Sequence, residues 1–285
     1  MPTGINITGT IEQHLDNIHN IERQDKLIEE QASKTQKQMM LWIMGAVAAF
    51  LLMIFAGAQV TAVMVMSIII LVTCAVMAII TGIMWSGLKK QDIEDRRLQL
   101  PLKFLGVIGR DIEKITPVTL NVDFQGYKVH GKLLEENKGG MLNPISTFKY
   151  ADSWFSTRGK LADGNRFNVS IKQNVKRKEK RKRKYTKINE RIDEDITLVL
   201  RISATRYPNW QQLNQYLSPG VHDGLQITRL HVAEGGLRLV CTTPETVNMQ
   251  GRGGSNTTMG NNLADGDTLL RLFLYVYNQL EKCRK

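Results

Sequence analysis

One run, residues 39–88, dominates the hydrophobic pattern of this chain and contains no Asp, Glu, Lys, Arg or His. A helix that crosses a bilayer needs roughly 20 apolar residues, so the run is long enough for two crossings. Gly57, Ala58 and Gln59 interrupt it near its middle. The pattern predicts two membrane helices, over residues 39–58 and 60–85, joined by a very tight turn. The alternative, a buried hairpin in a soluble protein, is disfavoured because each half reaches full crossing length.

The segment before this run, residues 11–38, has the periodicity of a helix that continues into the first span. Its seven-residue rows are Ile11, Ile18, Asp25 and Ala32, and His14, Ile21 and Ile28. Such rows are typical of a short coiled coil, here an imperfect one that would join protomers. The alternatives are a helix packed on the chain's own soluble domain and an amphipathic helix on the headgroups. Residues 3–10 are turn-rich and are expected to fray.

After the run the sequence is polar and rich in helix formers. Residues 89–97 are predicted to continue helically out of the membrane, and Pro101 to break that helix. Residues 103–114 are expected to form a short interfacial helix. The predicted segments are a cytosolic helix (1–38), a transmembrane hairpin (39–88), a helical linker (89–116) and a β-rich cytosolic domain (117–285).

From Val118 the hydrophobic period changes to two, which is typical of strands. The predicted strands are 118–124, 127–135, 145–150, 155–161, 166–173, 196–203, 225–233 and 236–242. Asp163-Gly164 and Glu234-Gly235-Gly236 lie between alternating runs and indicate hairpins. A short helix over 210–217, a Gly- and Asn-rich loop over 249–266 and a final helix over 267–282, capped by Asp265 or Asp267, complete the pattern.

The predicted fold class is therefore a membrane helical hairpin with an N-terminal helix and a C-terminal α+β domain. That domain is mainly antiparallel β and is closed by the long C-terminal helix.

Charge adds a second feature to this picture. The formal net charge is +11 at pH 7, and much of the excess lies in one block. Its nine basic residues, against the single acid Glu179, are Lys176, Arg177, Lys178, Lys180, Arg181, Lys182, Arg183, Lys184 and Lys187. A dense local block of this kind is an electrostatic site for polyanions. Because it interrupts two strand patterns, residues 174–195 are predicted to form a hairpin arm or a mobile loop.

Three interpretations of this arm compete. Anionic lipid headgroups are the first, because each Lys or Arg near a charged bilayer surface contributes roughly 1 kcal/mol. RNA or DNA phosphates are the second, although Tyr185 is the only aromatic residue available for base stacking. A solvated arm, neutralised by the acidic residues of 190–195, is the third.

The flanks of the hydrophobic run predict its orientation. Basic residues lie on both sides of it, at Lys26, Lys34 and Lys37 and at Lys89, Lys90, Arg96, Arg97 and Lys103. The positive-inside rule places both flanks, and hence both termini, in the cytoplasm. The membrane is expected to be a plasma membrane or a bacterial inner membrane.

Small residues recur at four-residue spacing in both predicted spans. They are Gly45, Ala49 and Gly57 in the first, a row in which Met53 occupies the remaining position, and Ala78, Gly82 and Ser86 in the second. Such stripes allow close helix packing, either between the two spans or between subunits. No ionisable group lies at mid-depth, which disfavours a pump or secondary transporter.

Candidate catalytic groups are sparse. Cys241 lies near His222, Asp223 and His231 in sequence, but no nucleophile motif surrounds it. The glycine-rich residues 250–256 lack the Gly-Lys-Ser/Thr ending of a phosphate-binding loop. The three cysteines fit neither a disulfide framework nor a zinc site, and weakly favour a reducing compartment. No cofactor or metal is expected.

These patterns favour a non-enzymatic membrane-anchored scaffold or binding protein whose β-rich domain contacts a protein partner and anionic headgroups. Homo-oligomerisation is expected, and nucleic acid is the less favoured ligand. The alternative function is an oligomeric membrane effector or channel-like protein gated by the cytosolic domain.

Overall fold

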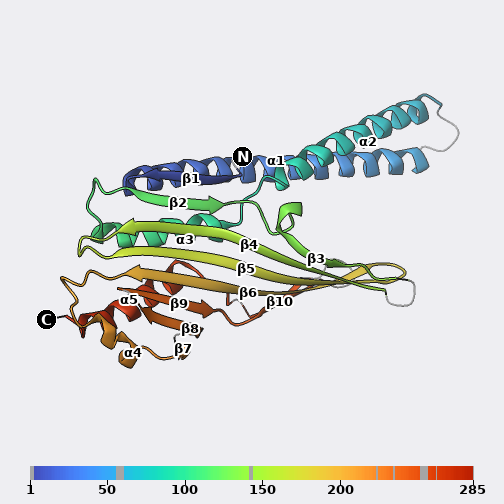
Figure 1. Ribbon diagram of the computed structural model, residues 1–285. Coiled ribbons are helices and arrows are strands. Elements are labelled where there is room, and N and C mark those ends of the chain that lie inside the picture. Colours follow the sequence, from blue (N-terminus) through green and yellow to red (C-terminus); the bar gives the residue numbers. More distant parts are fainter. Residues whose placement is uncertain are drawn as a thin grey trace. The chain divides into compact units, whose positions relative to one another are not determined.

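The computed structural model describes residues 3–55, 61–140, 144–222, 224–233, 235–250, 256–260 and 262–284. The chain divides into two compact units (Figure 1). One unit is His19–Ile93, and the other combines Pro2–Ile18 with Glu94–Lys285.

The first unit consists mainly of two long helices. Helix α1 runs from Ile11 to Phe55 without a break, as the sequence pattern predicts, and α2 runs from Thr61 to Lys89. Both are long and apolar enough to cross a membrane. The predicted turn at Gly57, Ala58 and Gln59 lies outside the described residues.

The second unit is built on one large antiparallel sheet, with β1-β2-β4-β5-β6-β9-β8-β7 as its main path. Additional strands β3 and β10 pair with β4 and β6, and β11 pairs with β10. The strands are β1 (Gly4–Gly9), β2 (Val118–Asp123), β3 (Leu133–Asn137), β4 (Ile145–Lys160), β5 (Arg166–Arg181), β6 (Thr186–Arg201), β7 (Gly220–His222), β8 (Leu225–Ala233), β9 (Gly236–Thr242), β10 (Thr246–Gln250) and β11 (Asn256–Met259).

Three long strands, β4, β5 and β6, join two parts of this sheet (Figure 1). At one end they pair with β2 and β9, and at the other end β4 pairs with β3 and β6 with β10. The predicted arm is a regular hairpin, paired from Asn174 and Asp193 out to Arg181 and Thr186. We call this end, made of β3, β10, β11 and residues 145–151, 174–181 and 186–193, the sheet extension. It is broader than the predicted arm because flanking strands take up the hairpin's outer hydrogen-bonding groups.

Two helices, α3 (Asp95–Ile108) and α5 (Gly266–Glu281), cover one face of the sheet. Phe104 of α3 makes edge-to-face contacts with Phe155 of β4 and Phe273 of α5, at centroid distances of 6.2 and 5.7 Å. Phe273 also contacts Phe167 of β5. Asp265 caps α5 by accepting a hydrogen bond from the Thr268 backbone N–H at 2.8 Å. Short helical turns at η1 (Gly109–Asp111), η2 (His130–Lys132), η3 (Trp210–Gln212) and α4 (Leu213–Tyr216) complete the unit.

The segment after α2 differs from the prediction. Helix α2 ends at Lys89, a new helix begins at Asp95, and Pro101 lies inside it instead of breaking it. A proline in a helix removes one backbone hydrogen bond. Here the apolar contacts of α3 outweigh that loss, because Leu98, Leu100, Phe104 and Leu105 are all buried. Helix α3 is thus a core element of the sheet unit, whereas residues 103–114 were expected to be interfacial.

Several short strands also differ from the prediction. Residues 4–9, expected to fray within the predicted N-terminal helical segment 1–38, form β1 and pair with β2. Residues 127–135 form a turn, η2 and the start of β3, in place of one strand. The predicted loop 249–266 contains the end of β10 and all of β11. These strands are short, and β1, β3 and β11 lie at edges, so their hydrogen-bonding partners define them more than their own hydrophobic pattern does.

The placement of β1 can be tested with two isoleucines on one strand. Ile5 is 5% exposed and Ile7 is 45% exposed. We expect Ile5→Ala to lower the thermal midpoint by about 5 °C or more, because removing a buried isoleucine costs about 2–5 kcal/mol. Ile7→Ala should change it little. Equal midpoints for the two variants in a thermal melt of the full chain would contradict the assigned strand.

Candidate functional site

The alternation of β5 and β6 divides the basic block between two faces of the sheet extension. Val175 and Ile192 pair with each other and are buried, so their face continues the helix-covered face of the sheet. We call it the inner face. Residues one position out of phase, beginning with Lys176 and Arg191, lie on the opposite, outer face.

On the inner face, the central cation Arg177 is paired with two acidic side chains. Arg177 donates from Nε to Glu179 at 2.6 Å and from Nη1 to Glu190 at 3.0 Å. Burial acts to lower the pKa of Arg177, but the hydrogen bond and charge of Glu179 outweigh it, so the pKa is raised. Arg177, one of the nine predicted anion-binding residues, is therefore engaged in a structural ion pair.

The outer face gathers four of the predicted residues, Lys176, Lys178, Lys180 and Lys187, all exposed. Cross-strand register places Lys180 opposite Lys187 on β6 and opposite Ile145 on β4. None of the four lysines forms an ion pair with any described residue.

Two further cations of this face, Lys149 and Arg191, were missed because they lie outside the basic block. They are the cross-strand neighbours of Lys176 on its two sides. Lys149 pairs with Glu135 at 2.6 Å and Arg191 with Glu245 at 3.7 Å, so the rim of the face is balanced by acids. The signal that could have found them is strand register, which the sequence alone did not fix.

Like charges directly opposite each other destabilise an antiparallel pair. The outer face places lysine opposite lysine and lysine opposite arginine, and its one acid on the central strands, Asp193, lies at the inner end opposite Asn174. An anion lying across this face would remove the repulsion, so the four lysines are the candidate anion-binding residues of the sheet extension. We call the part of the outer face formed by Lys176, Lys178, Lys180 and Lys187 the basic face.

The remaining predicted cations lie at the end of the hairpin. Arg181 is the last residue of β5, and Lys182, Arg183 and Lys184 form the exposed turn. The turn closes through a hydrogen bond from the Lys182 N–H to the Tyr185 carbonyl at 2.9 Å. The Lys182 ammonium also lies over the Tyr185 ring, 5.3 Å from its centroid. The one aromatic of the block is thereby engaged by a neighbouring cation.

Gly45 and Gly82, two of the small residues of the long helices, lie where the helices meet. A Cβ atom added to Gly45 would come within 3.1 Å of the Cys74 sulfur, and one added to Gly82 within 3.5 Å of the Met39 sulfur. Ala49 is 3% exposed, Ala78 is half-buried and Ser86 is exposed. Gly57 lies outside the described residues. Contacts within one chain account for Gly45 and Gly82 without a second subunit.

The polar members of the predicted heptad rows are used within the chain. His14 is buried, and its Nε2 lies 2.7 Å from the Val118 carbonyl oxygen. Asp25 accepts a hydrogen bond from the Ile93 N–H at 3.1 Å. These contacts favour packing on the chain's own residues, and self-association stays a prediction. The carboxylate oxygens of Asp25, Glu29 and Asp92 lie within 4.8 Å of one another. This proximity alone does not identify a metal site.

The catalytic candidates do not assemble into a reactive group in the described structure. Cys241 is fully buried in β9, and burial raises the pKa of its thiol to about 12. The His222 ring stacks on Tyr275 of α5 at 3.8 Å. Asp223 and residues 251–255 of the glycine-rich loop lie outside the described residues.

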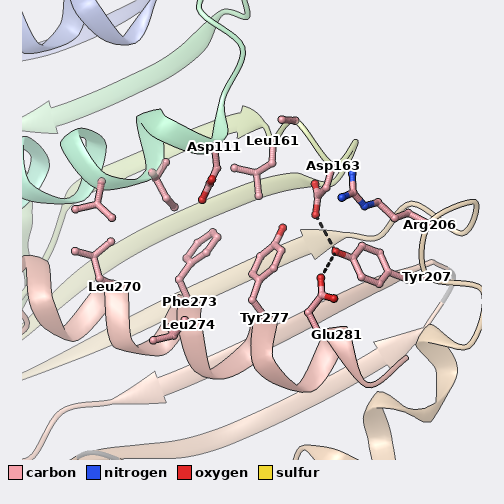
Figure 2. Close-up of a pocket in the computed structure, with 13 residues that line it drawn as sticks. Asp111, Leu161, Asp163, Arg206, Tyr207, Leu270, Phe273, Leu274, Tyr277 and Glu281 are labelled. Atoms are coloured by element: carbon pink, nitrogen blue, oxygen red, sulfur yellow. Dashed lines mark hydrogen bonds between the residues drawn. The ribbon is translucent and has the colours of Figure 1, made fainter. Parts of the chain in front are cut away.

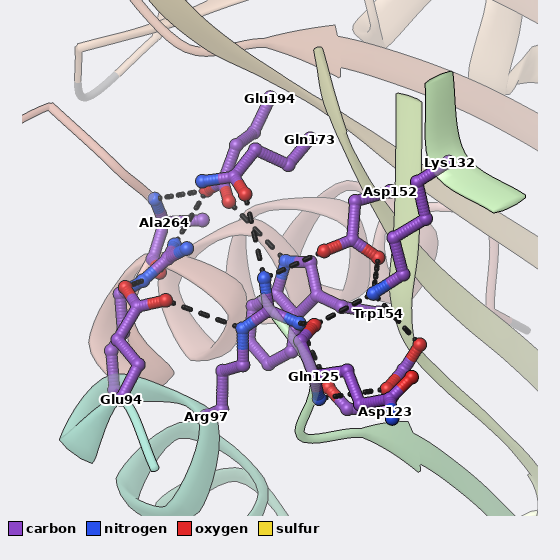
Figure 3. A network of polar contacts seen from close by, with 11 residues as sticks. Glu94, Arg97, Asp123, Gln125, Lys132, Asp152, Trp154, Gln173, Glu194 and Ala264 are labelled. Atoms are coloured by element: carbon purple, nitrogen blue, oxygen red, sulfur yellow. Dashed lines mark hydrogen bonds and ion pairs between the residues drawn. The ribbon is translucent and has the colours of Figure 1, made fainter. Parts of the chain in front are cut away.

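A buried ion network fixes the start of α3 to the sheet (Figure 3). Arg97, 1% exposed, donates to Asp152 of β4 at 2.6 Å and to the carbonyl oxygens of Asp123 and Gln125, each at 2.8 Å. Its Nε also lies 3.2 Å from Glu94. One guanidinium thus connects α3 with β2 and β4.

Arg96 extends the network to β6. It donates to the buried Glu194 at 2.8 Å and to the Ala264 carbonyl oxygen at 3.0 Å. Burial acts to lower its pKa, but the charges of Glu194 and Glu94 outweigh this and raise it. Both guanidinium groups also lie over Trp154, at 5.0 Å for Arg96 and 5.3 Å for Arg97.

Comparison with known proteins supplies no relative: the chain matches no protein-family model, no curated protein and no solved structure.

The burial of Cys241 predicts slow alkylation. A raised pKa keeps the thiol protonated at pH 8, so iodoacetamide should modify Cys241 at least about 100-fold more slowly in the native chain than in the unfolded chain. Mass spectrometry of the Cys241 peptide over a time course would measure both rates. Rapid native modification would reopen the catalytic interpretation.

The ion network predicts a large loss of stability from Arg97→Met. The variant leaves Asp152 with Lys132 alone and removes the donor of the Asp123 and Gln125 carbonyl oxygens, and breaking such a buried pair costs roughly 3–5 kcal/mol. We expect the thermal midpoint of the full chain to fall by about 6 °C or more. Arg158→Met, at an exposed arginine of the same sheet, is the control. The double variant R97M/D152L should recover part of the loss, and failure of R97M to destabilise would contradict the role assigned to Arg97.

Proposed function

We propose that this chain is a non-enzymatic, membrane-anchored scaffold or binding protein that contacts anionic lipid headgroups through the basic face. The observation that carries the proposal is the cross-strand arrangement of Lys176, Lys178, Lys180 and Lys187, which have no acidic partner among the described residues. A protein partner and homo-oligomerisation belong to the same proposal.

The exposed side chains of α1 and α2 support a membrane anchor. In the most apolar windows of the two helices, only 6% and 11% of the residues are buried. Large apolar side chains such as Leu41, Met44, Ile79 and Ile83 are 64–69% exposed. Moving one such side chain out of water contributes about 1.5–3 kcal/mol, so many of them together favour a bilayer strongly. This is the physical reason to propose insertion of both helices.

The lysines beside these helices support the proposed orientation. Lys26, Lys34 and Lys37 precede the apolar part of α1, and Lys89 and Lys90 follow that of α2, all exposed. Under the positive-inside rule both groups stay on the cytoplasmic side of a plasma or bacterial inner membrane. The sheet unit is then cytosolic, beside the leaflet that carries anionic lipid.

The form of the basic face favours headgroups over nucleic acid. A sheet face presents its lysines in one layer, and each Lys near an anionic surface contributes roughly 1 kcal/mol. Binding of single-stranded nucleic acid also uses aromatic side chains for base stacking. Tyr185 is the aromatic of the block, and Lys182 already lies over its ring.

Lysine acetylation of the full chain in nanodiscs tests the proposal. We expect Lys176, Lys178, Lys180 and Lys187 to be acetylated about fivefold more slowly in discs containing anionic lipid than in neutral discs. The protection should disappear at about 0.5 M salt, where the Debye length is only about 4 Å. Mass spectrometry gives the rate for each lysine, and exposed Lys114 provides the internal reference.

Two variants of equal charge change separate the basic face from the hairpin end. K176Q/K178Q/K180Q/K187Q should abolish the protection of neighbouring Lys149, whereas R181Q/K182Q/R183Q/K184Q should retain it. Stronger protection by single-stranded RNA in neutral discs than by anionic lipid would move the function to nucleic-acid binding. No protection in either arm would contradict the proposal.

A further inference from the structure

A cavity of about 410 Å³ lies between α3, α5, the turn after β4 and the segment before η3. It is independent of the basic face, and none of the predicted site residues lines it. Its volume falls within the range of small-molecule sites, about 300–1,000 Å³. The cavity therefore has room for a ligand of that class.

The two ends of the cavity differ in chemistry (Figure 2). Val107, Leu270 and Leu274 form an apolar end, and Val107 and Leu274 are 44% and 60% exposed. Asp163, Tyr207 and Glu281 converge at the other end (Figure 2). A ligand that fills the cavity must therefore be amphiphilic.

The polar end is rich in acceptors. The Tyr207 hydroxyl lies 3.1 Å from Glu281 and 3.3 Å from Asp163, and its single proton can serve only one of the two carboxylates at a time. Burial raises the pKa of Tyr207, so the hydroxyl stays protonated. Asp163 also accepts two hydrogen bonds from Asn165, at 2.9 and 2.6 Å, and Glu281 accepts one from Arg284 at 3.1 Å. Because a carboxylate offers about four acceptor sites, both groups retain capacity toward a donor in the cavity.

The charges of the lining are unbalanced. Asp111, Asp163 and Glu281 contribute three carboxylates, against the single cation Arg206. Arg284, which does not line the cavity, pairs with Glu281 at 3.1 Å. Neither Asp111 nor Asp163 pairs with a basic side chain of the described structure. The lining thus disfavours an anionic head and favours a cationic one.

Aromatic rings border the same end. Phe273 and Tyr277 are stacked at 5.8 Å with an interplanar angle of 11°, and Tyr207 lies beside the carboxylates. Aromatic faces attract cations, and rings together with carboxylates are the usual environment of bound ammonium groups. Charge and ring arrangement therefore favour the same ligand chemistry.

We propose that this cavity binds an amphiphile with an ammonium head and an apolar chain. The head lies among Asp163, Tyr207, Tyr277 and Glu281, and the chain extends along Phe273 toward Leu274. The source is either a free amphiphilic amine or the choline-type headgroup of a lipid.

Calorimetry with the full chain in a non-ionic amphipol tests this proposal without competing lipid ammonium groups. The probes are octyltrimethylammonium, octanol and octanoate, which share a chain and differ in the head. We expect octyltrimethylammonium to bind about tenfold more tightly than octanoate, with octanol between them. Octylphosphocholine separates the two sources: equal binding assigns a lipid headgroup, and weaker binding a free amine.

Variants connect the binding to the cavity. D111N/E281Q removes two exposed carboxylates from the lining and should weaken octyltrimethylammonium binding about tenfold. E12Q/E113Q, which removes two exposed carboxylates elsewhere, should leave it unchanged. Octanoate binding as tight as octyltrimethylammonium, or equal affinities in the two double variants, would overturn the proposal.

Discussion

The guanidinium of Arg97 is the contact on which the sheet unit most depends. It is buried where α3 begins, and it joins that helix to Asp152 of β4 and to the carbonyl oxygens of Asp123, at the end of β2, and Gln125. Lys132 adds a second cation, 2.7 Å from Asp152 and 2.8 Å from Asp123. A buried charge is tolerated only when its partners are all in place, so this network favours one position of α3 on the sheet. The position of α3 then determines where Phe104 packs and where one wall of the cavity lies.

The long strands give the chain two different surfaces from one sheet. Where α3 and α5 cover it, β5 and β6 alternate Phe167, Val169 and Ile171 with polar residues and form the core. Beyond Val175 no helix of the described chain covers the inner face, and ion pairs such as Arg177–Glu190 replace the apolar core. The outer face, whose acid on the central strands of the sheet extension is Asp193 alone, then becomes mainly a layer of lysines. One continuous hairpin thereby serves both the core and the proposed contact with anions.

The proposed sites differ in sign and in ligand. The basic face would attract an extended anionic surface, while the cavity between α3 and α5 would take a single ammonium head with an apolar chain. The first depends on many weak, salt-sensitive interactions at full exposure. The second depends on a few charged and aromatic contacts in a cavity that is partly open to solvent. The charged residues of both proposed sites lie outside the hydrophobic core. Binding at one site does not require binding at the other.

The sequence alone determined the helices, strands, caps and turns that depend on interactions between residues close in sequence. A fifty-residue run without charges predicts two long apolar helices, and strict alternation predicts β2, β8 and β9. The cap at Asp265 and the hairpin turn at Asp163-Gly164 follow from side-chain and backbone chemistry within a few residues. The basic block was also visible, since nine cations in twelve positions need no partner to be recognised.

Only the tertiary structure decided what depends on pairing between distant residues. Strand register placed Lys176 and Lys187 on one face and Arg177 on the other, and it added Lys149 from β4. β1 became a strand because β2 offers it hydrogen bonds, and Pro101 stayed in a helix because the surrounding core compensates for one lost bond. The cavity forms where four separate segments meet. Composition and periodicity indicate which secondary structure a residue favours within its own segment. Faces, edges and cavities arise from contacts between distant segments, which no local pattern encodes.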